Sequence, residues 1–295
     1  MKHLNKIHIV TIDSRKEIFE QTKSWWESHG WEVISLNNTD TLLAEGRNKF
    51  LKEFYKSDDD WIIISDDDLI LWEDGMKIVG FPDWDRTNSI NTTETFLTDN
   101  STFFNNIPDQ TVLVTPARGI SFSPATRFDI WSYRYLYNND YCKDSWMLVH
   151  TKEIAGIMMM KNTKKHLDKE FYQDAVIPSL EDLEFAIQIL DAGYNTAAVI
   201  NIAYNSLTPA SDSTLFSSQE ERVVKNKLSC RYLADKYYGI ECNDEGRINK
   251  RKWMQRIIGP VGFRTVVTDI KPVKCLQIND TTLKSEITLE SLFGE

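Results

Sequence analysis

The sequence predicts an α/β fold, with a mostly parallel sheet flanked by helices. Three short apolar runs, at residues 7–12, 31–36 and 61–64, have the length and composition of buried strands. The two segments between them carry apolar residues at helical spacing. Strands that alternate with helices in this way pair in parallel through right-handed crossovers. The hydrophobic fraction of the 295 residues, 41%, is that of a globular protein with a real core.

The N-terminal elements carry their own start and stop signals. Ser14 and Glu17 follow the first strand with the spacing of a capping box, so a helix should begin here. It should run to about His29, because Gly30 can adopt the left-handed conformation that ends a helix. The elements expected next are a strand at 31–36, a turn at 37–40, a helix from about Thr41 to Lys56, and the buried strand at 61–64.

The middle of the chain is less regular. Residues 73–110 are polar and rich in turn formers, which predicts an insertion of loops over a site, with a tolerated surface loop as the alternative. Order returns with a strand from Thr111 that Pro116 should close. The later elements expected are strands at 146–150, 156–160 and 196–202, a helix from the capping-box spacing at Ser179 to Gly193, and a long helix from Ser218 to about Tyr238.

Composition excludes several classes of protein. No apolar run is long enough to cross a bilayer, and the N-terminus has no signal-peptide core, so we expect no membrane partner. The four cysteines stand far apart, at positions 142, 230, 242 and 275. This spacing predicts reduced thiols in a cytoplasmic protein, and argues against a disulfide framework or a zinc site.

Charge is divided unevenly along the chain. The formal net charge of -10 argues against a non-specific nucleic-acid coat protein. Residues 58–109 hold thirteen acidic and two basic residues, whereas residues 247–274 hold eight basic residues and one acidic residue. We therefore predict two parts, a large α/β domain over 1–215 and a basic helical extension over 216–295. A metal could bind in the acidic region and phosphates in the basic one.

Three consecutive carboxylates, Asp66, Asp67 and Asp68, follow the buried strand at 61–64 directly. Burying them unpaired would cost several kcal/mol, so something cationic should neutralise them. Strand alternation places Asp66 and Asp68 on one side and Asp67 on the other. Carboxylate oxygens are ligands that Mg²⁺ and Mn²⁺ prefer, and ligands bind at the carboxyl ends of strands in α/β sheets. An acidic surface turn is the alternative.

Three further groups of residues could take part in the chemistry. Asp13 and Arg15 follow the first strand, and Arg47 could donate two hydrogen bonds to a phosphate or a carboxylate. Glu181 and Asp182 open a helix, where the helix dipole favours negative charge. A carboxylate kept ionised there could be the general base for an acceptor hydroxyl, although capping alone explains Asp182 equally well.

Taken in order, these motifs resemble nucleotide-sugar glycosyltransferases of the GT-A fold, over roughly residues 7–205. The resemblance implies that Asp66 and Asp68, the DxD motif, help to hold Mn²⁺ or Mg²⁺ and the diphosphate of the donor. It implies Asp182 as the catalytic base if the reaction inverts the anomeric centre. If the reaction retains it, Asp182 or Glu181 instead orients donor and acceptor, and the sequence does not decide between the two. The donor would be a nucleoside-diphosphate sugar, and a UDP-sugar is the first candidate. Its binding residues would be Asp13, Arg15, Arg47, Asn48 and Asp67. The C-terminal histidine that often completes the metal site is missing, since the last histidine is His166.

A narrower resemblance, carried by Arg47-Asn48, 61–69, 156–161 and 181–195, is to the DNA-modifying glycosyltransferases of tailed bacteriophages. It implies a hydroxymethylated base in duplex DNA as acceptor, 5-hydroxymethylcytosine first, and a location in the cytoplasm of an infected host. The residues expected to contact the DNA are Lys250, Arg251, Lys252, Trp253 and Arg256. The alternatives are a surface glycan or protein acceptor, a nucleotidyltransferase, a non-catalytic binding module, and cations that merely coat a helix.

Overall fold

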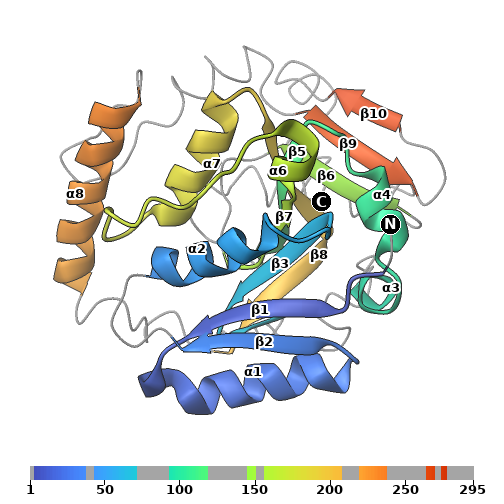
Figure 1. Cartoon of the computed structure of the whole chain (residues 1–295), viewed down its shortest axis with the longest axis horizontal. Coiled ribbons are helices and arrows are strands. Elements are labelled where there is room, and N and C mark those ends of the chain that lie inside the picture. Colours follow the sequence, from blue (N-terminus) through green and yellow to red (C-terminus); the bar gives the residue numbers. More distant parts are fainter. Residues whose placement is uncertain are drawn as a thin grey trace, which may run out of the picture.

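A computed structural model describes residues 3–37, 43–71, 93–118, 145–150, 156–207, 219–237, 264–269 and 274–277. These residues form one sheet with helices on its two faces, so the predicted α/β fold is confirmed (Figure 1). The strands are β1 (Lys6–Thr11), β2 (Glu32–Asn37), β3 (Trp61–Asp66), β4 (Leu69–Leu71), β5 (Thr111–Arg118), β6 (Ser145–His150), β7 (Met158–Lys161), β8 (Asn195–Ser206), β9 (Arg264–Asp269) and β10 (Lys274–Gln277). The helices are η1 (Asp13–Arg15), α1 (Lys16–Ser28), α2 (Leu43–Phe54), α3 (Thr93–Thr98), α4 (Ser101–Asn106), α6 (Thr163–Leu167), α7 (Glu181–Asp191) and α8 (Gln219–Lys236).

Strand directions divide the sheet into two parts. Its order is β10-β9-β6-β8-β5-β7-β3-β1-β2, and β4 pairs with β8. β1 lies parallel to both β2 and β3, as the strand–helix–strand pattern predicts. β5 lies parallel to β8, while β7 runs antiparallel between β3 and β5, and β6, β9 and β10 pair antiparallel. The sheet is therefore mixed, with its parallel N-terminal strands on the side that carries the acidic motif.

β3 is buried on both faces, as its continuous apolar run predicts. Trp61 and Ile63 pack in one cluster with residues of α1, α3 and α4, and Ile62 and Ile64 pack in another with residues of α2 and α7. The methionines of β7 follow the same alternation and are all buried, which confirms their place in the core. Each buried side chain of this size contributes about 1.5–3 kcal/mol. These two clusters fix the end of β3 relative to α2 and α7.

The prediction of capping boxes at the starts of α1 and α7 is wrong. α1 begins at Lys16 after a 3₁₀ turn, and its N-cap, Arg15, makes no side-chain capping bond. α7 has Leu180 at its N-cap, in the left-handed conformation and again without a side-chain cap, while the Ser179 hydroxyl bonds to the Ser229 hydroxyl. At α7 a long-range contact takes Ser179, the residue that sequence spacing assigned to the cap, whereas at α1 Ser14 lies within the 3₁₀ turn that precedes the helix. The predicted helix-ending glycines are confirmed, since Gly30 and Gly193 have φ of 79° and 86°.

Other boundaries differ from expectation. β5 continues through Pro116, and its register against β8 shifts just after that residue. The described part of the 73–110 insertion holds α3 and α4, whose Phe96, Phe103 and Phe104 are buried, so it is core and not a loop. Within the extension predicted to be helical, α8 is confirmed, but 264–269 and 274–277 form strands of the same sheet.

Candidate active site at the carboxyl end of β3

The carboxyl ends of β1 and β3 meet at one edge of the sheet, because the two strands are parallel neighbours. β3 ends at Asp66, and the turn to β4 consists of Asp67 and Asp68. Opposite this turn, the Thr11 hydroxyl donates to Oδ2 of Asp67 over 3.1 Å. The register of β1 and β3 therefore places the residues after β1 against the three carboxylates.

Arg15, in the 3₁₀ turn after β1, forms ion pairs with two of these carboxylates. Its Nε lies 2.8 Å from Oδ1 of Asp67, and its Nη2 lies 3.0 Å from Oδ2 of Asp68. The Ser206 hydroxyl donates to the same Oδ2 over 2.8 Å. The 3₁₀ turn, which replaces the predicted capping box, is the element that brings Arg15 here. Asp13, its companion in the sequence prediction, instead accepts a hydrogen bond from Nδ2 of Asn37.

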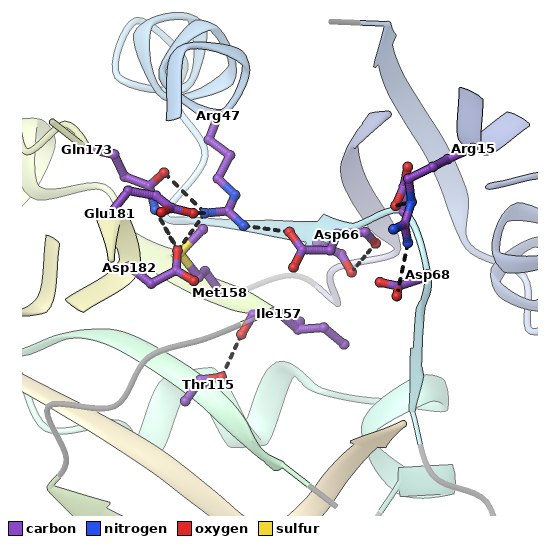
Figure 2. Close-up of polar contacts among 12 residues, drawn as sticks. Arg15, Arg47, Asp66, Asp68, Thr115, Ile157, Met158, Gln173, Glu181 and Asp182 are labelled. Carbon is purple, nitrogen blue, oxygen red and sulfur yellow. Dashed lines mark hydrogen bonds and ion pairs between the residues drawn. The ribbon is translucent and has the colours of Figure 1, made fainter. Parts of the chain in front are cut away.

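Arg47 connects Asp66 to the start of α7 (Figure 2). Its Nη2 donates to Oδ1 of Asp66, and its Nη1 donates to Oδ1 of Asp182, each over 2.5 Å. Nη1 also lies 3.6 Å from Oε1 of Glu181. The side chain is only 1% exposed. Burial alone would lower the pKa of this guanidinium, but Asp182, Asp66 and Glu181 outweigh burial and raise it, so Arg47 stays charged.

Asp182 has the properties of a general base. Burial, with a smaller contribution from the neighbouring Glu181, raises its pKa to about 6 against the opposing effects of Arg47 and Gln173. A carboxylate with this pKa is ionised at neutral pH yet basic enough to take a proton from a hydroxyl. The capping alternative is not supported, because the N-cap of α7 has no side-chain bond and Oδ1 of Asp182 is held by Arg47 instead.

Gln173 is a site residue that sequence reasoning missed. It lies between α6 and α7, is 3% exposed, and its Nε2 donates to Oδ1 of Asp182 over 3.1 Å. Its backbone is held by Asn48, whose Nδ2 donates to the Gln173 carbonyl and whose Oδ1 accepts from the Gln173 N–H. Asn48, expected near the donor, thus contacts the protein. A single glutamine between helices has no spacing signal, so no sequence pattern could have found it.

The charges of this cluster do not balance. In the described residues, the ion pairs of this cluster join five carboxylates to two arginines. The carboxylates are those of Asp66, Asp67, Asp68, Glu181 and Asp182, and the arginines are Arg15 and Arg47. Burial raises the pKa of Asp66, and raises that of Asp67 to about 6, in spite of the arginines. The cluster therefore carries excess negative charge, which favours a bound cation.

Asp66 and Asp68 are carboxylates, the ligand type that Mn²⁺ and Mg²⁺ prefer. In the described part of the chain, the side-chain contacts of Asp66 use Oδ1 and those of Asp68 use Oδ2. The same residues contain no group of three histidine, cysteine or acidic side chains arranged to hold a metal. Mg²⁺ is usually held by one or two carboxylates together with substrate phosphates, so two aspartates are a chemically adequate protein contribution.

α8 is joined to the segment that carries Gln173 and Asp182. Lys236 lies 2.7 Å from Oδ2 of Asp174 and 2.9 Å from Oε1 of Glu184. Tyr232 donates to the same Asp174 oxygen, and Tyr237 to Oε1 of Glu184. The Glu184 side chain is fully buried. The polar residues that begin the predicted extension therefore hold both ends of the 174–184 segment.

Replacing Lys236 should show how much this junction stabilises the fold. In Lys236→Met the buried carboxylate of Glu184 keeps Tyr237 but loses its cation, which we expect to cost about 2–3 kcal/mol of unfolding free energy, at the low end for a buried pair because Lys236 is partly exposed. Urea unfolding at pH 7 measures this. The matched control is Lys225→Met, which removes an i,i+4 pair with Glu221 on the same helix and should cost less than about 0.5 kcal/mol. Equal losses in the two variants would contradict the prediction.

The predicted DNA-contacting residues, Lys250, Arg251, Lys252, Trp253 and Arg256, lie outside the described residues. The same holds for residues 72–92 of the predicted insertion. Among the helices that are described, none combines the length and apolar composition needed to cross a membrane.

No protein-family model matches the sequence, and no curated protein matches it. Solved structures that match the chain include A197 from STIV, at 12% identity and a TM-score of 0.38, covering 70% of this chain and 87% of A197. They also include S. aureus TarS 1-349 in complex with UDP-GlcNAc, at 12% identity and a TM-score of 0.40, covering 77% of this chain and 66% of TarS 1-349. Similarity at this level assigns no activity.

Proposed function

We propose that the protein is a glycosyltransferase that moves a sugar from a nucleoside-diphosphate sugar, a UDP-sugar first, to a hydroxyl acceptor. One observation carries the proposal. Asp66, the first of three acidic residues at the carboxyl end of β3, is joined through the buried Arg47 to Asp182, a carboxylate with a raised pKa at the start of α7. In this proposal Asp66 would contribute to a cation site for a diphosphate and Asp182 would be the base for an acceptor hydroxyl, with Arg47 between them.

Each side chain has a separate task in the proposed reaction. Asp182 takes the proton of the acceptor hydroxyl as its oxygen attacks the anomeric carbon, and the bond to the diphosphate breaks with inversion. Asp66 and Asp68 would hold Mn²⁺ or Mg²⁺, which when bound neutralises the charge of the departing diphosphate. Arg15 pairs with Asp67 and Asp68 beside that position and can also contact phosphate oxygens.

Arg47 and Asn48 act indirectly, which revises their expected role as donor-binding residues. Both terminal nitrogens of the Arg47 guanidinium bond to carboxylates or Gln173, and the Asn48 side chain bonds to the Gln173 backbone. They would fix the distance between the acidic turn and the base. Glu181 lies beside Asp182 and raises its pKa.

We further propose that the acceptor is duplex DNA with hydroxymethylated bases. The first candidate base is 5-hydroxymethylcytosine. This proposal is supported by the sequence alone. Residues 247–274 contain eight basic residues, and Trp253 lies in the same segment. A surface glycan or a protein acceptor is the alternative with the same site. A nucleotidyltransferase would share the acidic turn but would transfer the nucleotide in place of the sugar.

The decisive test is an incubation with Mn²⁺, a panel of labelled nucleotide-sugars, and duplexes with and without 5-hydroxymethylcytosine. We expect free nucleoside diphosphate and sugar label on the hydroxymethylated duplex only. Asp68→Asn should abolish most of this transfer, because a neutral amide is a poor ligand for a hard cation. The matched control is Asp109→Asn, an exposed aspartate paired with Lys161 at the start of β5.

Each other outcome identifies a different error. Label on a glycan or protein but not on DNA would reject the DNA acceptor and keep the enzyme class. Nucleotide label on the acceptor would indicate nucleotidyl transfer. Release of no nucleotide from any donor would reject glycosyl transfer, and unchanged turnover of Asp68→Asn would reject the metal assignment.

A further inference from the structure

We propose that Gln173 is a positioning residue, which holds one carboxylate oxygen of Asp182 so that the other oxygen faces the acceptor hydroxyl. This inference rests on the proposed glycosyl transfer and adds a residue that neither the motifs nor the resemblance contains. Gln173 lies in the irregular segment between α6 and α7 and is almost fully buried. A buried amide away from any helix or strand needs a reason to be there, because its desolvation costs free energy unless all its polar atoms are bonded.

The side-chain amide is bonded at both ends, and only one orientation satisfies its neighbours. Its Oε1 accepts from Nη1 of Arg47 over 3.2 Å, and its Nε2 donates to Oδ1 of Asp182 over 3.1 Å (Figure 2). If the amide were flipped, two donors would face each other at Arg47 and two acceptors at Asp182. The orientation of Gln173 is therefore set by the charges of both neighbours. A glutamate here would repel Asp182, and an apolar side chain would remove one acceptor from the guanidinium.

The backbone of Gln173 is fixed from the same helix that carries Arg47. Nδ2 of Asn48 donates to the Gln173 carbonyl over 2.7 Å, and Oδ1 of Asn48 accepts from the Gln173 N–H over 2.9 Å. Two consecutive residues of α2 thus hold Gln173. The Arg47 side chain bonds to the side chain of Gln173, and the Asn48 side chain bonds to its backbone. Such a reciprocal pair fixes both the position and the orientation of the residue, which is what a positioning role needs.

The consequence for Asp182 is that its two oxygens differ. Oδ1 receives both Nη1 of Arg47 and Nε2 of Gln173, and the hydrogen bonds from described residues end on this oxygen. Oδ2 is then the oxygen available for proton transfer. The charged groups that face Asp182 are Arg47 from α2, Glu181 on its own helix, and Asp66 at the end of β3. Donation from Gln173 favours the ionised form against the two carboxylates, so its removal should raise the pKa of Asp182.

The test is Gln173→Met, which keeps the volume of the side chain and removes its hydrogen bonds to Arg47, Asp182 and the sulfur of Met158. Carbon-13 NMR of carboxyl-labelled protein follows the titration of Asp182, whose resonance is identified by its loss in Asp182→Asn. We expect the midpoint to rise by about one pH unit, which corresponds to one lost hydrogen bond to a charged group. In transfer assays we expect kcat at pH 7 to fall about tenfold, with the acid limb displaced upward and KM for the donor unchanged.

Two further variants make the result specific. Gln173→Glu keeps the acceptor for Arg47, so it should fold even if the methionine variant does not, and it should raise the Asp182 midpoint by more. Gln188→Met is the matched control, because Gln188 donates to the Tyr172 carbonyl over 3.2 Å and its loss should leave the Asp182 midpoint unchanged.

The NMR readout separates this inference from the proposed function. If the midpoint rises in both Gln173 variants but no donor is ever turned over, Gln173 positions Asp182 and glycosyl transfer is wrong. If the wild type transfers sugar but the midpoint is the same in wild type, Gln173→Met and Gln173→Glu, the positioning role is overturned while the enzyme class stands. An equal rise in Gln188→Met would also overturn it.

Discussion

Replacing Asp182 by Asn should reduce sugar transfer at least about a hundredfold while the donor still binds. The amide keeps the size of the side chain and can still accept from Arg47 through its oxygen, but it cannot take a proton from a hydroxyl. Because burial raises the pKa of Asp182 to about 6, wild-type kcat should fall as the pH drops through that value. The sign follows from the base being active only when ionised. The asparagine variant should lack this limb.

The measurement is the pH dependence of kcat from pH 5 to 8, with donor affinity from thermal shift in parallel, since a ligand of the folded state raises the melting temperature. Asp191→Asn, the same exchange at the exposed end of α7, is the control and should behave as wild type. If Asp182→Asn retained more than a tenth of the activity, Asp182 would not be the base. If it lost donor binding as well, Asp182 would belong to the donor site.

Replacing Arg47 by Met should give the largest loss of stability in the site. The methionine fills similar space but leaves Asp66, Glu181 and Asp182 close together without their shared cation. Removing one partner from a buried ion pair costs about 3–5 kcal/mol, because the remaining charge stays uncompensated. Part of this loss should be recovered at pH 5. Without Arg47 the pKa values of the folded-state carboxylates rise further, so they bind protons as the pH falls and the repulsion disappears.

Urea unfolding at pH 7.5 and pH 5 measures both effects. Lys23→Met, which removes an exposed pair with Glu27 on α1, is the control and should change stability by less than about 0.5 kcal/mol at either pH. Arg47→Lys keeps the charge but cannot reach Asp66 and Asp182 together, so its loss should be intermediate. A loss in Arg47→Met that was the same at both pH values would mean that packing, and not charge, is what Arg47 supplies.

The sequence predicted the fold class, and it indicated several of the charged residues that meet beside the end of β3, because both depend on local patterns. The apolar run at 61–64 indicated a strand buried on both faces, and the acids after it had to be at its end. The alternation of strands and helices then placed Arg15 at the same edge. The features that could not be predicted depend on contacts between distant segments. The antiparallel direction of β7, the buried phenylalanines of α3 and α4, and the bonds of Gln173 have no signature in their own neighbourhood.

The two predicted capping boxes also show that contacts between distant segments cannot be predicted from local sequence patterns. Ser179 has the right spacing to Asp182, but its hydroxyl bonds to Ser229. Ser14 has the right spacing to Glu17, but it lies in the 3₁₀ turn and Arg15 is the N-cap of α1. Arg15 and Asp182 are needed for ion pairs that span the site, and those pairs are stronger than a cap. Local rules fail here where charged side chains converge, as is expected at a functional site.

The junction of α8 with Asp174 and Glu184 limits how this protein could be recombined. A chimaera with its junction at residue 215 would lack Tyr232, Lys236 and Tyr237. The segment next to Gln173 would then lose the side chains that bond to Asp174 and Glu184. A graft made after Tyr237 would keep them. An exchange of C-terminal segments should therefore be tolerated only where it keeps these residues and also β9 and β10, because β9 pairs with β6 in the same sheet.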